Sequence, residues 1–160
     1  ETPIAVSAQG QIWLQGDRTS AEHFPKGLAD VAWLRLFYSS GFEATIHVSW
    51  ANPDKQRRLG VVGDRGTLVF DEMQPTEPLV LQHGAFEPQG MYFVPTNLER
   101  EVVAVPPGEP LKAVCQHFIQ CVADNQNSEI SSGQIGTDLV SALVALSQSL
   151  NQDGQRVELL

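Results

Sequence analysis

The chain has 160 residues, 42% of them hydrophobic, which is enough for one globular domain with a substantial core. Its 19 acidic and 10 basic residues give a formal net charge of −9 at pH 7. This balance argues against a sequence-independent binder of nucleic acid or anionic membranes, because few cations are available to neutralise phosphates. The N-terminus, ETPIAV, lacks an initiator Met and a signal-peptide apolar region, which predicts a chain that starts inside a longer protein or has been processed.

The first third of the chain is predicted to form strands. Residues 3–15 alternate apolar and polar side chains, with a possible bulge at Gly10, and residues 16–27 are typical of a surface loop. Residues 28–38 are apolar on both faces, which predicts a central strand covered on two sides. Residues 42–50 alternate again, and Pro53 ends this strand because proline has no amide donor.

The middle of the chain predicts a hairpin followed by looser structure. Residues 55–62 and 67–70 are predicted strands joined at Gly63 to Gly66. Residues 79–82 predict a short strand, and residues 83–97 an irregular aromatic loop that is either a lid or local packing. Residues 101–105 predict one more strand.

From Pro110 the apolar spacing changes to three and four residues, which predicts two amphipathic helices. The first runs from Pro110 towards residue 124. The second begins near Ser131 or Ser132, where Ser131 and Gln134 resemble a capping box, and ends at residues 153–154. Gly136 in its first turns predicts a close backbone approach, since Gly costs helix stability by about 1 kcal/mol. Residues 156–159 predict an edge strand.

Five to seven strands joined mainly by hairpins and followed by two helices predict an α+β fold. We expect an open, mostly antiparallel sheet with the two C-terminal helices packed on one face. The strand at residues 28–38 is apolar on both sides, so its other face would expose a large apolar surface. Such surfaces mark interfaces, which predicts a sheet-face contact with another copy or with a further domain.

The sequence predicts no metal site and no cofactor cradle of its own. Cys115 and Cys121 lie on one predicted helix about 9 Å apart, beyond disulfide reach, and free thiols suit a reducing, cytoplasmic location. His117 between them is interpreted as packed or half-exposed and not as a ligand. The chain contains no GxGxxG, no GxxxxGK[ST] and no GxSxG motif.

Three segments together resemble a known family. They are HVSWANPDKQRRLGVVGDRGTLVFDE (47–72), EPLKAVCQHFIQCV (109–122) and SSGQIGTDLVSALVALSQSL (131–150). In this order and spacing they resemble the C-terminal domain of the Gfo/Idh/MocA oxidoreductases, whose fold is glyceraldehyde-phosphate-dehydrogenase-like. Within that family the nucleotide-sugar dehydrogenase branch looks closest. The resemblance covers nearly the whole chain.

The resemblance implies that residues 1–160 form a single substrate-binding and oligomerisation domain of an NAD(P)-dependent enzyme acting on a sugar or nucleotide sugar. An N-terminal Rossmann domain, absent from this chain, would bind NAD or NADP. The family's catalytic Lys lies in a Glu-Lys-Pro motif, and its Asp and His lie on a helix ahead of the first strand. Neither has a counterpart here, so no catalytic or cofactor-binding residue is expected in this chain, which alone should be inactive.

The resemblance also implies that four residues face the substrate, namely Trp50, Asn52, Lys55 and Arg57. Asn and Lys can bond sugar hydroxyls and an Arg fork suits a diphosphate, and Lys55 and Arg57 would share one strand face. The alternative is an ordinary solvated strand start, because charged residues are common at sheet edges. By a similar argument His47 is interpreted as a hydrogen-bonded structural group, and Trp50 can equally cap the core.

A second hypothesis is a stand-alone, non-catalytic sheet domain used for oligomerisation or small-ligand binding. The two hypotheses differ in what precedes Glu1. A GxGxxG strand-turn-helix and a Glu-Lys-Pro upstream would favour the dehydrogenase, whereas their absence would favour the binding module.

Overall fold

A computed structural model describes residues 1–13 and 29–159, which form eight strands and two helices. They divide into two compact units, one of residues 1–52 and 115–160 and one of residues 53–114. All strand pairs are antiparallel, and the helices follow β7 in the chain, which confirms the predicted α+β class. The predicted single sheet is instead two four-stranded sheets, one in each unit.

The sheet of the first unit has the order β3-β2-β1-β8. Its strands are β1 (Ala5–Gln11), β2 (Val31–Phe37), β3 (Glu43–Ser49) and β8 (Val157–Glu158). The central position predicted for the second strand is confirmed, since β2 pairs with both β1 and β3. The predicted loop at residues 16–27, and the outer ends of its flanking strands at 14–15 and 28, lie outside the described residues.

The bulge predicted at Gly10 is wrong. Gly10 pairs with Ala32 in an unbroken β1–β2 register. A Cβ atom at Gly10 would lie 2.8 Å from the Cβ of Ala29 and 3.0 Å from Cδ2 of Leu150. The position therefore excludes a side chain because of close packing, not because the strand is irregular.

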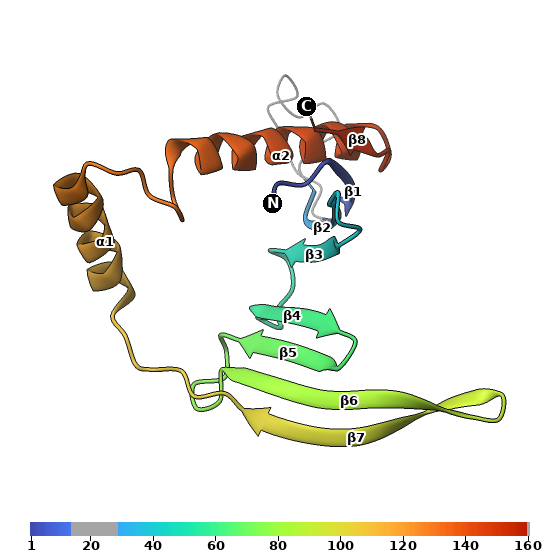
Figure 1. The fold of residues 1–160 in the computed structure, drawn as a ribbon. Coiled ribbons are helices and arrows are strands. Elements are labelled where there is room, and N and C mark those ends of the chain that lie inside the picture. Colours follow the sequence, from blue (N-terminus) through green and yellow to red (C-terminus); the bar gives the residue numbers. More distant parts are fainter. Residues whose placement is uncertain (14–28, 160) are drawn as a thin grey trace. The chain divides into compact units, whose positions relative to one another are not determined.

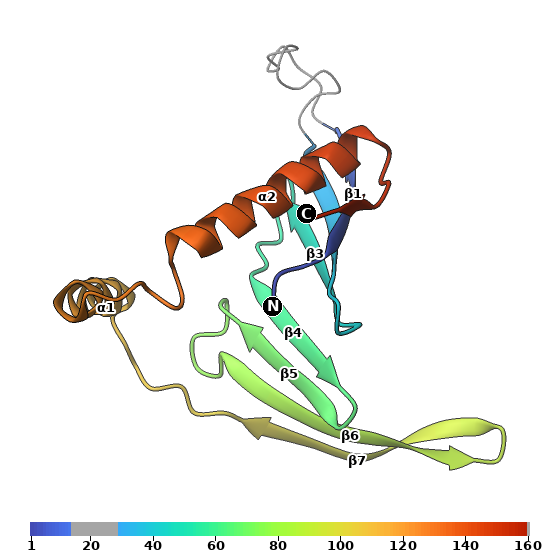
Figure 2. The same cartoon turned by 45° about the horizontal axis from the view of Figure 1, so that its top comes forward.

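Helix α2 (Gly133–Asn151) lies across the sheet over β1 and builds the core of this unit (Figure 2). Val6 and Ala8 of β1 are buried against Ala145 and Leu146, with partly buried apolar residues of β2 and β8 around them. The predicted capping box makes Ser131 the N-cap, but the helix begins one residue later. The Oγ of Ser132 accepts the N–H of Ile135, so Ser132 is the N-cap.

Helix α1 (Pro110–Asp124) has the predicted amphipathic pattern, but none of its residues is buried. Its apolar stripe, which includes Leu111, Phe118 and Ile119, is exposed in the described part of the chain. Of the two predicted helices, α2 therefore packs on a sheet, whereas α1 presents an unpartnered apolar face.

The sheet of the second unit has the order β4-β5-β6-β7. Its strands are β4 (Arg58–Gly63), β5 (Gly66–Asp71), β6 (Leu79–Gln89) and β7 (Tyr92–Val102), and the predicted turn between Gly63 and Gly66 is confirmed. The irregular loop predicted at residues 83–97 is wrong. That segment is a long hairpin in which β6 and β7 continue beyond the end of β5 (Figure 1). The prolines and glycines that suggested a loop lie within the paired strands or at the turn.

The open face of β2 is less apolar than predicted. Val31 is buried, and the guanidinium groups of Arg35 and Arg156 lie 5.1 and 4.6 Å from the ring centroid of Phe37. Trp33 and Arg35 are the residues of this row that remain well exposed. The two guanidinium groups near the Phe37 ring make this face of β2 partly polar.

No described helix is long and apolar enough to cross a membrane.

A single buried hydroxyl connects three parts of the first unit. The Oγ of Ser149, which is fully buried, accepts the N–H of Ala8 at 2.9 Å and donates to the carbonyl of Gln155 at 2.5 Å. Ser149 thereby ties β1 to α2 and to the segment that leads into β8. Because the Ala8 amide lies in the core, no water can replace this acceptor easily.

Replacing Ser149 with Ala should lower the free energy of unfolding by about 1–3 kcal/mol, because it leaves a buried amide and a carbonyl without partners. Ser147 on the same helix is the matched control, since its exposed hydroxyl only donates to the carbonyl of Leu143. Ser147→Ala should change stability by less than about 0.5 kcal/mol. Urea denaturation followed by circular dichroism measures both, and equal midpoints for the two variants would refute the role given to Ser149.

Candidate functional site

The four predicted substrate-facing residues are divided between the two units. Trp50 and Asn52 end one segment of the first unit, and Lys55 and Arg57 begin the second, because the boundary falls between Asn52 and Pro53. Trp50 is 63% exposed, so it does not cap the core. Its backbone N–H donates to the carbonyl of Asp30 at 3.3 Å, which fixes the end of β3.

Lys55 and Arg57 precede β4 and lie outside any strand, so the prediction that they share a strand face is wrong. Arg57 is held in place by Glu72. Its Nη1 lies 2.7 Å from the Glu72 carboxylate, and its carbonyl accepts the Glu72 N–H at 3.0 Å. Lys55 makes no ion pair with another residue of the described ranges. The two cations therefore differ: Arg57 is anchored, and Lys55 is an available ammonium group.

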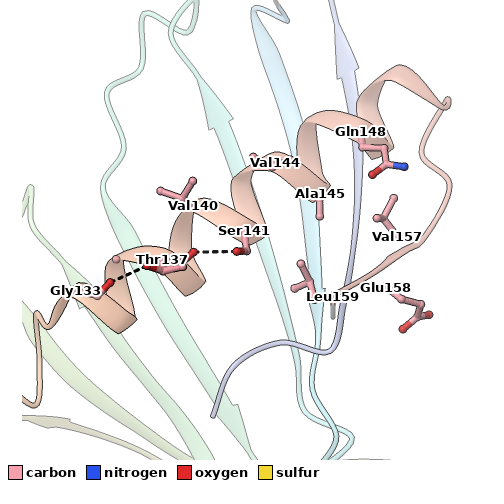
Figure 3. Close-up of a pocket in the computed structure, with 11 residues that line it drawn as sticks. Gly133, Thr137, Val140, Ser141, Val144, Ala145, Gln148, Val157, Glu158 and Leu159 are labelled. Atoms are coloured by element: carbon pink, nitrogen blue, oxygen red, sulfur yellow. Dashed lines mark hydrogen bonds between the residues drawn. The ribbon is translucent and has the colours of Figure 1, made fainter.

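A groove of about 730 Å³ runs along α2, and Figure 3 shows it between the helix and the C-terminal segment. Sequence reasoning did not predict this groove, although the small residues at helical spacing on α2 are its signal. It is lined by Gly133, Gly136, Thr137, Val140, Ser141, Val144, Ala145, Gln148, Val157, Glu158 and Leu159.

The groove offers little reactive chemistry. The Oγ1 of Thr137 donates to the carbonyl of Gly133 and the Oγ of Ser141 to that of Thr137, each at 3.0 Å, as the dashed lines in Figure 3 show. With both hydroxyls bonded inside the helix, the remaining lining is mainly apolar, and Glu158 is its charged member. Such a surface suits a packed segment better than a reacting substrate.

The close backbone approach predicted at Gly136 is not found within the described chain, because a Cβ atom there would meet nothing within 4 Å. Gly136→Ala should therefore raise the free energy of unfolding of this chain by about 0.5–1 kcal/mol through helix propensity. Gly10→Ala, which inserts a Cβ atom 2.8 Å from that of Ala29, should instead destabilise it. Thermal denaturation compares the two, and a destabilised Gly136→Ala variant would show that the groove is filled in the isolated chain.

The open face of the first sheet carries an aromatic and polar row. Gln9, Trp33 and His47 are neighbours across β1, β2 and β3, and the Trp33 and His47 rings stack at 5.5 Å with an angle of 19° between planes. Within the described chain the interaction of the His47 ring is this stack, and not the predicted hydrogen bond. The sequence pattern placed His47 on the polar face but did not predict Trp33 as its partner.

On α1 the two thiols are unpaired and His117 is half-buried, as predicted, but Cys115 is exposed. Cys115 and Cys121 are free thiols. His117 is half-buried, with Nε2 2.8 Å from the Oγ of Ser128 and 3.6 Å from the Sγ of Cys121. Residues 1–13 and 29–159 contain no group of three or more His, Cys, Asp or Glu side chains that could hold a metal ion.

A second, polar pocket of about 350 Å³ lies on the sheet of the second unit. Arg58, Asp71, Glu77 and Arg100 supply its charges, and Arg100 and Glu77 form an ion pair at 2.5 Å. Two cations and two anions leave the pocket without net charge, so it shows no preference for an anionic ligand. The four predicted site residues line neither this pocket nor the groove on α2.

Comparisons with known proteins identify the fold. No family model matches the chain, and no curated protein matches it. Among solved structures, levoglucosan dehydrogenase in complex with NADH aligns over 99% of this chain and 45% of its own, with a TM-score of 0.68 and 14% identity. UDP-N-acetylglucosamine 3-dehydrogenase GnnA from Acidithiobacillus ferrooxidans aligns over 93% and 44%, with a TM-score of 0.67 and 20% identity.

The WlbA dehydrogenase from Bordetella pertussis, in complex with NADH and UDP-GlcNAcA, aligns over 99% of this chain and 39% of its own, with a TM-score of 0.63 and 14% identity. At these identities the likeness is one of fold. It confirms at that level the resemblance found in the sequence, and it covers almost all of the present chain. The chain spans less than half the length of each of these dehydrogenases.

Proposed function

We propose that this chain is the C-terminal domain of an NAD(P)-dependent Gfo/Idh/MocA-type oxidoreductase that acts on a sugar or nucleotide sugar. The observation that carries the proposal is the asymmetry of the structural matches: 93–99% of this chain but only 39–45% of each dehydrogenase is covered. The part of those enzymes without a counterpart here is long enough to hold a nucleotide-binding domain.

In this proposal NAD or NADP is bound by an N-terminal Rossmann domain, and none is bound by this chain alone. WlbA and levoglucosan dehydrogenase, two of the structures with this fold, were solved with NADH. The proposed partner domain also supplies the catalytic acid and base. The present chain contributes a rigid scaffold and one wall of the substrate pocket.

We place that wall at Trp50, Asn52, Lys55 and Arg57. The exposed indole of Trp50 can stack on a sugar ring, and the available ammonium group of Lys55 can donate to hydroxyl or phosphate oxygens. One guanidinium nitrogen of Arg57 donates to the Glu72 carboxylate. This ion pair fixes the direction of the remaining guanidinium N–H groups, which can bind a ligand. Lys55 should therefore contribute binding energy, and Arg57 should contribute orientation.

In the complete protein, Lys55→Ala should raise the KM for the sugar substrate by about tenfold with little change in kcat, because it removes a binding contact made equally in the ground and transition states. Arg65, a highly exposed cation of the same unit, provides the matched control. Arg65→Ala should leave both constants unchanged. Steady-state assays with NAD and NADP over a panel of free and UDP-linked sugars give these values.

An unchanged KM in Lys55→Ala would remove the proposed wall without touching the domain assignment. A complete protein that oxidises no sugar with either nicotinamide would contradict the assignment itself. That second outcome would favour the stand-alone oligomerisation or ligand-binding domain.

We also propose a homo-oligomer that forms through the open apolar face of the second sheet. The strand register pairs Leu59 with Phe70 and Val61 with Leu68, so these side chains form one continuous face. All four are exposed in the described part of the chain. An apolar face of this kind indicates a contact surface.

Leu59→Ser should weaken self-association by about tenfold or more, because Leu59 is 62% exposed on that face and would be buried in the contact. Val62 points to the opposite face of the same strand and is even more exposed, so Val62→Ser is the control and should have no effect. Sedimentation equilibrium measures both variants. A loss that is equal in the two would mean that the contact lies elsewhere.

A further inference from the structure

The hairpin of β6 and β7 projects as an isolated two-stranded arm, which we define as residues 84–98 (Figure 1). The last β5–β6 pair joins Gly66 to His83, and beyond it β6 pairs only with β7. A register shift between His83 and Ala85 marks the base of the arm, and Asn97 there has φ 54°. An isolated ribbon of this length buries little and is marginally stable by itself, so contacts outside the described chain would stabilise it.

The arm contains a short internal repeat, Phe86-Glu87-Pro88 on β6 and Phe93-Val94-Pro95 on β7. The register pairs Phe86 with Pro95 and Pro88 with Phe93. These four residues lie on one face of the ribbon because they alternate with Glu87 and Val94. Each row across the ribbon therefore places a Phe ring beside a proline, in opposite order in the two rows. Phe86 and Phe93 are both 71% exposed.

Proline weakens both edges of the arm as sites for a further strand. Gly90, with φ 64°, and Met91 form a two-residue turn, so the flanking pair Gln89–Tyr92 is hydrogen-bonded and the next pair, Pro88–Phe93, is not. The same alternation makes Phe86–Pro95 a non-bonded pair. Backbone groups of such pairs point outward, and proline offers no donor there. A partner is therefore better accommodated on a face of the arm than at its edges.

We propose that this face binds the same face of a second copy of the chain. The two copies are related by a two-fold axis that lies in the plane of contact. Phe86 of one copy then packs on Pro88 or Pro95 of the other copy, and Phe93 packs on the remaining proline. Every ring thus meets a proline and no two Phe rings collide. The repeat makes the surface complementary to itself, which is what a two-fold symmetric interface requires.

Charge does not oppose this occupant at the arm itself. The chain carries a net charge of −9, yet Glu87 is the single charged residue of the arm. Two acidic copies repel over most of their surface, and this contact avoids that repulsion. The Phe and Pro side chains expose roughly 400 Å² of surface per copy, which is about half of the area that each partner buries in a stable interface. The arm contact alone should therefore dissociate on dilution.

Sedimentation equilibrium of the 160-residue chain tests the contact, in the Leu59→Ser background so that the open sheet face does not mask it. Phe86→Ser with Phe93→Ser should weaken association by about 100-fold, since central aromatic anchors dominate such contacts. Tyr92→Ser is the matched control, because it removes an exposed ring at the same tip from the opposite face. It should leave association unchanged.

A double variant that associates like its parent, an equal loss in Tyr92→Ser, or a parent that stays monomeric at high concentration would each overturn the proposal. Amide hydrogen exchange of the parent provides a reading that does not depend on variant folding. Exchange at residues 84–98 should slow as protein concentration rises. Exchange that is independent of concentration would overturn the proposal as well.

Discussion

The packing of α2 on β1 is the contact on which the first unit depends. The core it forms is small: Val6 and Ala8 from the strand meet Ala145 and Leu146 from the helix. Ser149 of α2 accepts a buried hydrogen bond from β1 and donates another to the carbonyl of Gln155. Gly10 lets Leu150 and Ala29 approach the strand without a side chain between them. Small residues at these positions bring helix and sheet close enough for dispersion and burial to stabilise them.

Many large apolar side chains remain outside this core. The stripe of α1, the flank of α2 at Val140 and Val144, and the open face of the second sheet are all exposed in the described part of the chain. A domain that folded only for itself would bury more of this surface. The pattern is consistent with our proposal that the rest of a longer protein and other copies cover these faces. It agrees with structural matches that cover almost all of this chain and less than half of each dehydrogenase.

Local periodicity predicted the elements that have one buried face or a clear turn. Three such predictions are confirmed: the central place of β2, the hairpin at Gly63 to Gly66, and helix α2. They rest respectively on the apolar pattern of the strand, on the turn preference of glycine, and on apolar residues spaced by three and four. The arm was missed because Pro88 and Pro95 normally indicate a loop. In a ribbon with free edges a proline costs no hydrogen bond, so the usual rule fails there.

Long-range features escaped the sequence for a related reason. The alternation of apolar and polar residues shows which side chains share a face of a strand, but it does not show to which sheet the strand belongs. The division into two sheets could therefore not be predicted from the sequence. The partner of Arg57 is Glu72, fifteen positions away, and a register was needed to bring them together. The residues proposed to face the substrate came from resemblance to a family and not from spacing, and their role stays a prediction.

In our proposal this chain is the part of a dehydrogenase that does not bind the nicotinamide. NADH fluorescence tests it most directly, measured for residues 1–160 alone and for the complete protein. We expect enhanced and blue-shifted emission with the complete protein and no change with the chain alone. Binding of NADH by the isolated chain, or no binding by the complete protein, would show that the proposed division of roles is wrong.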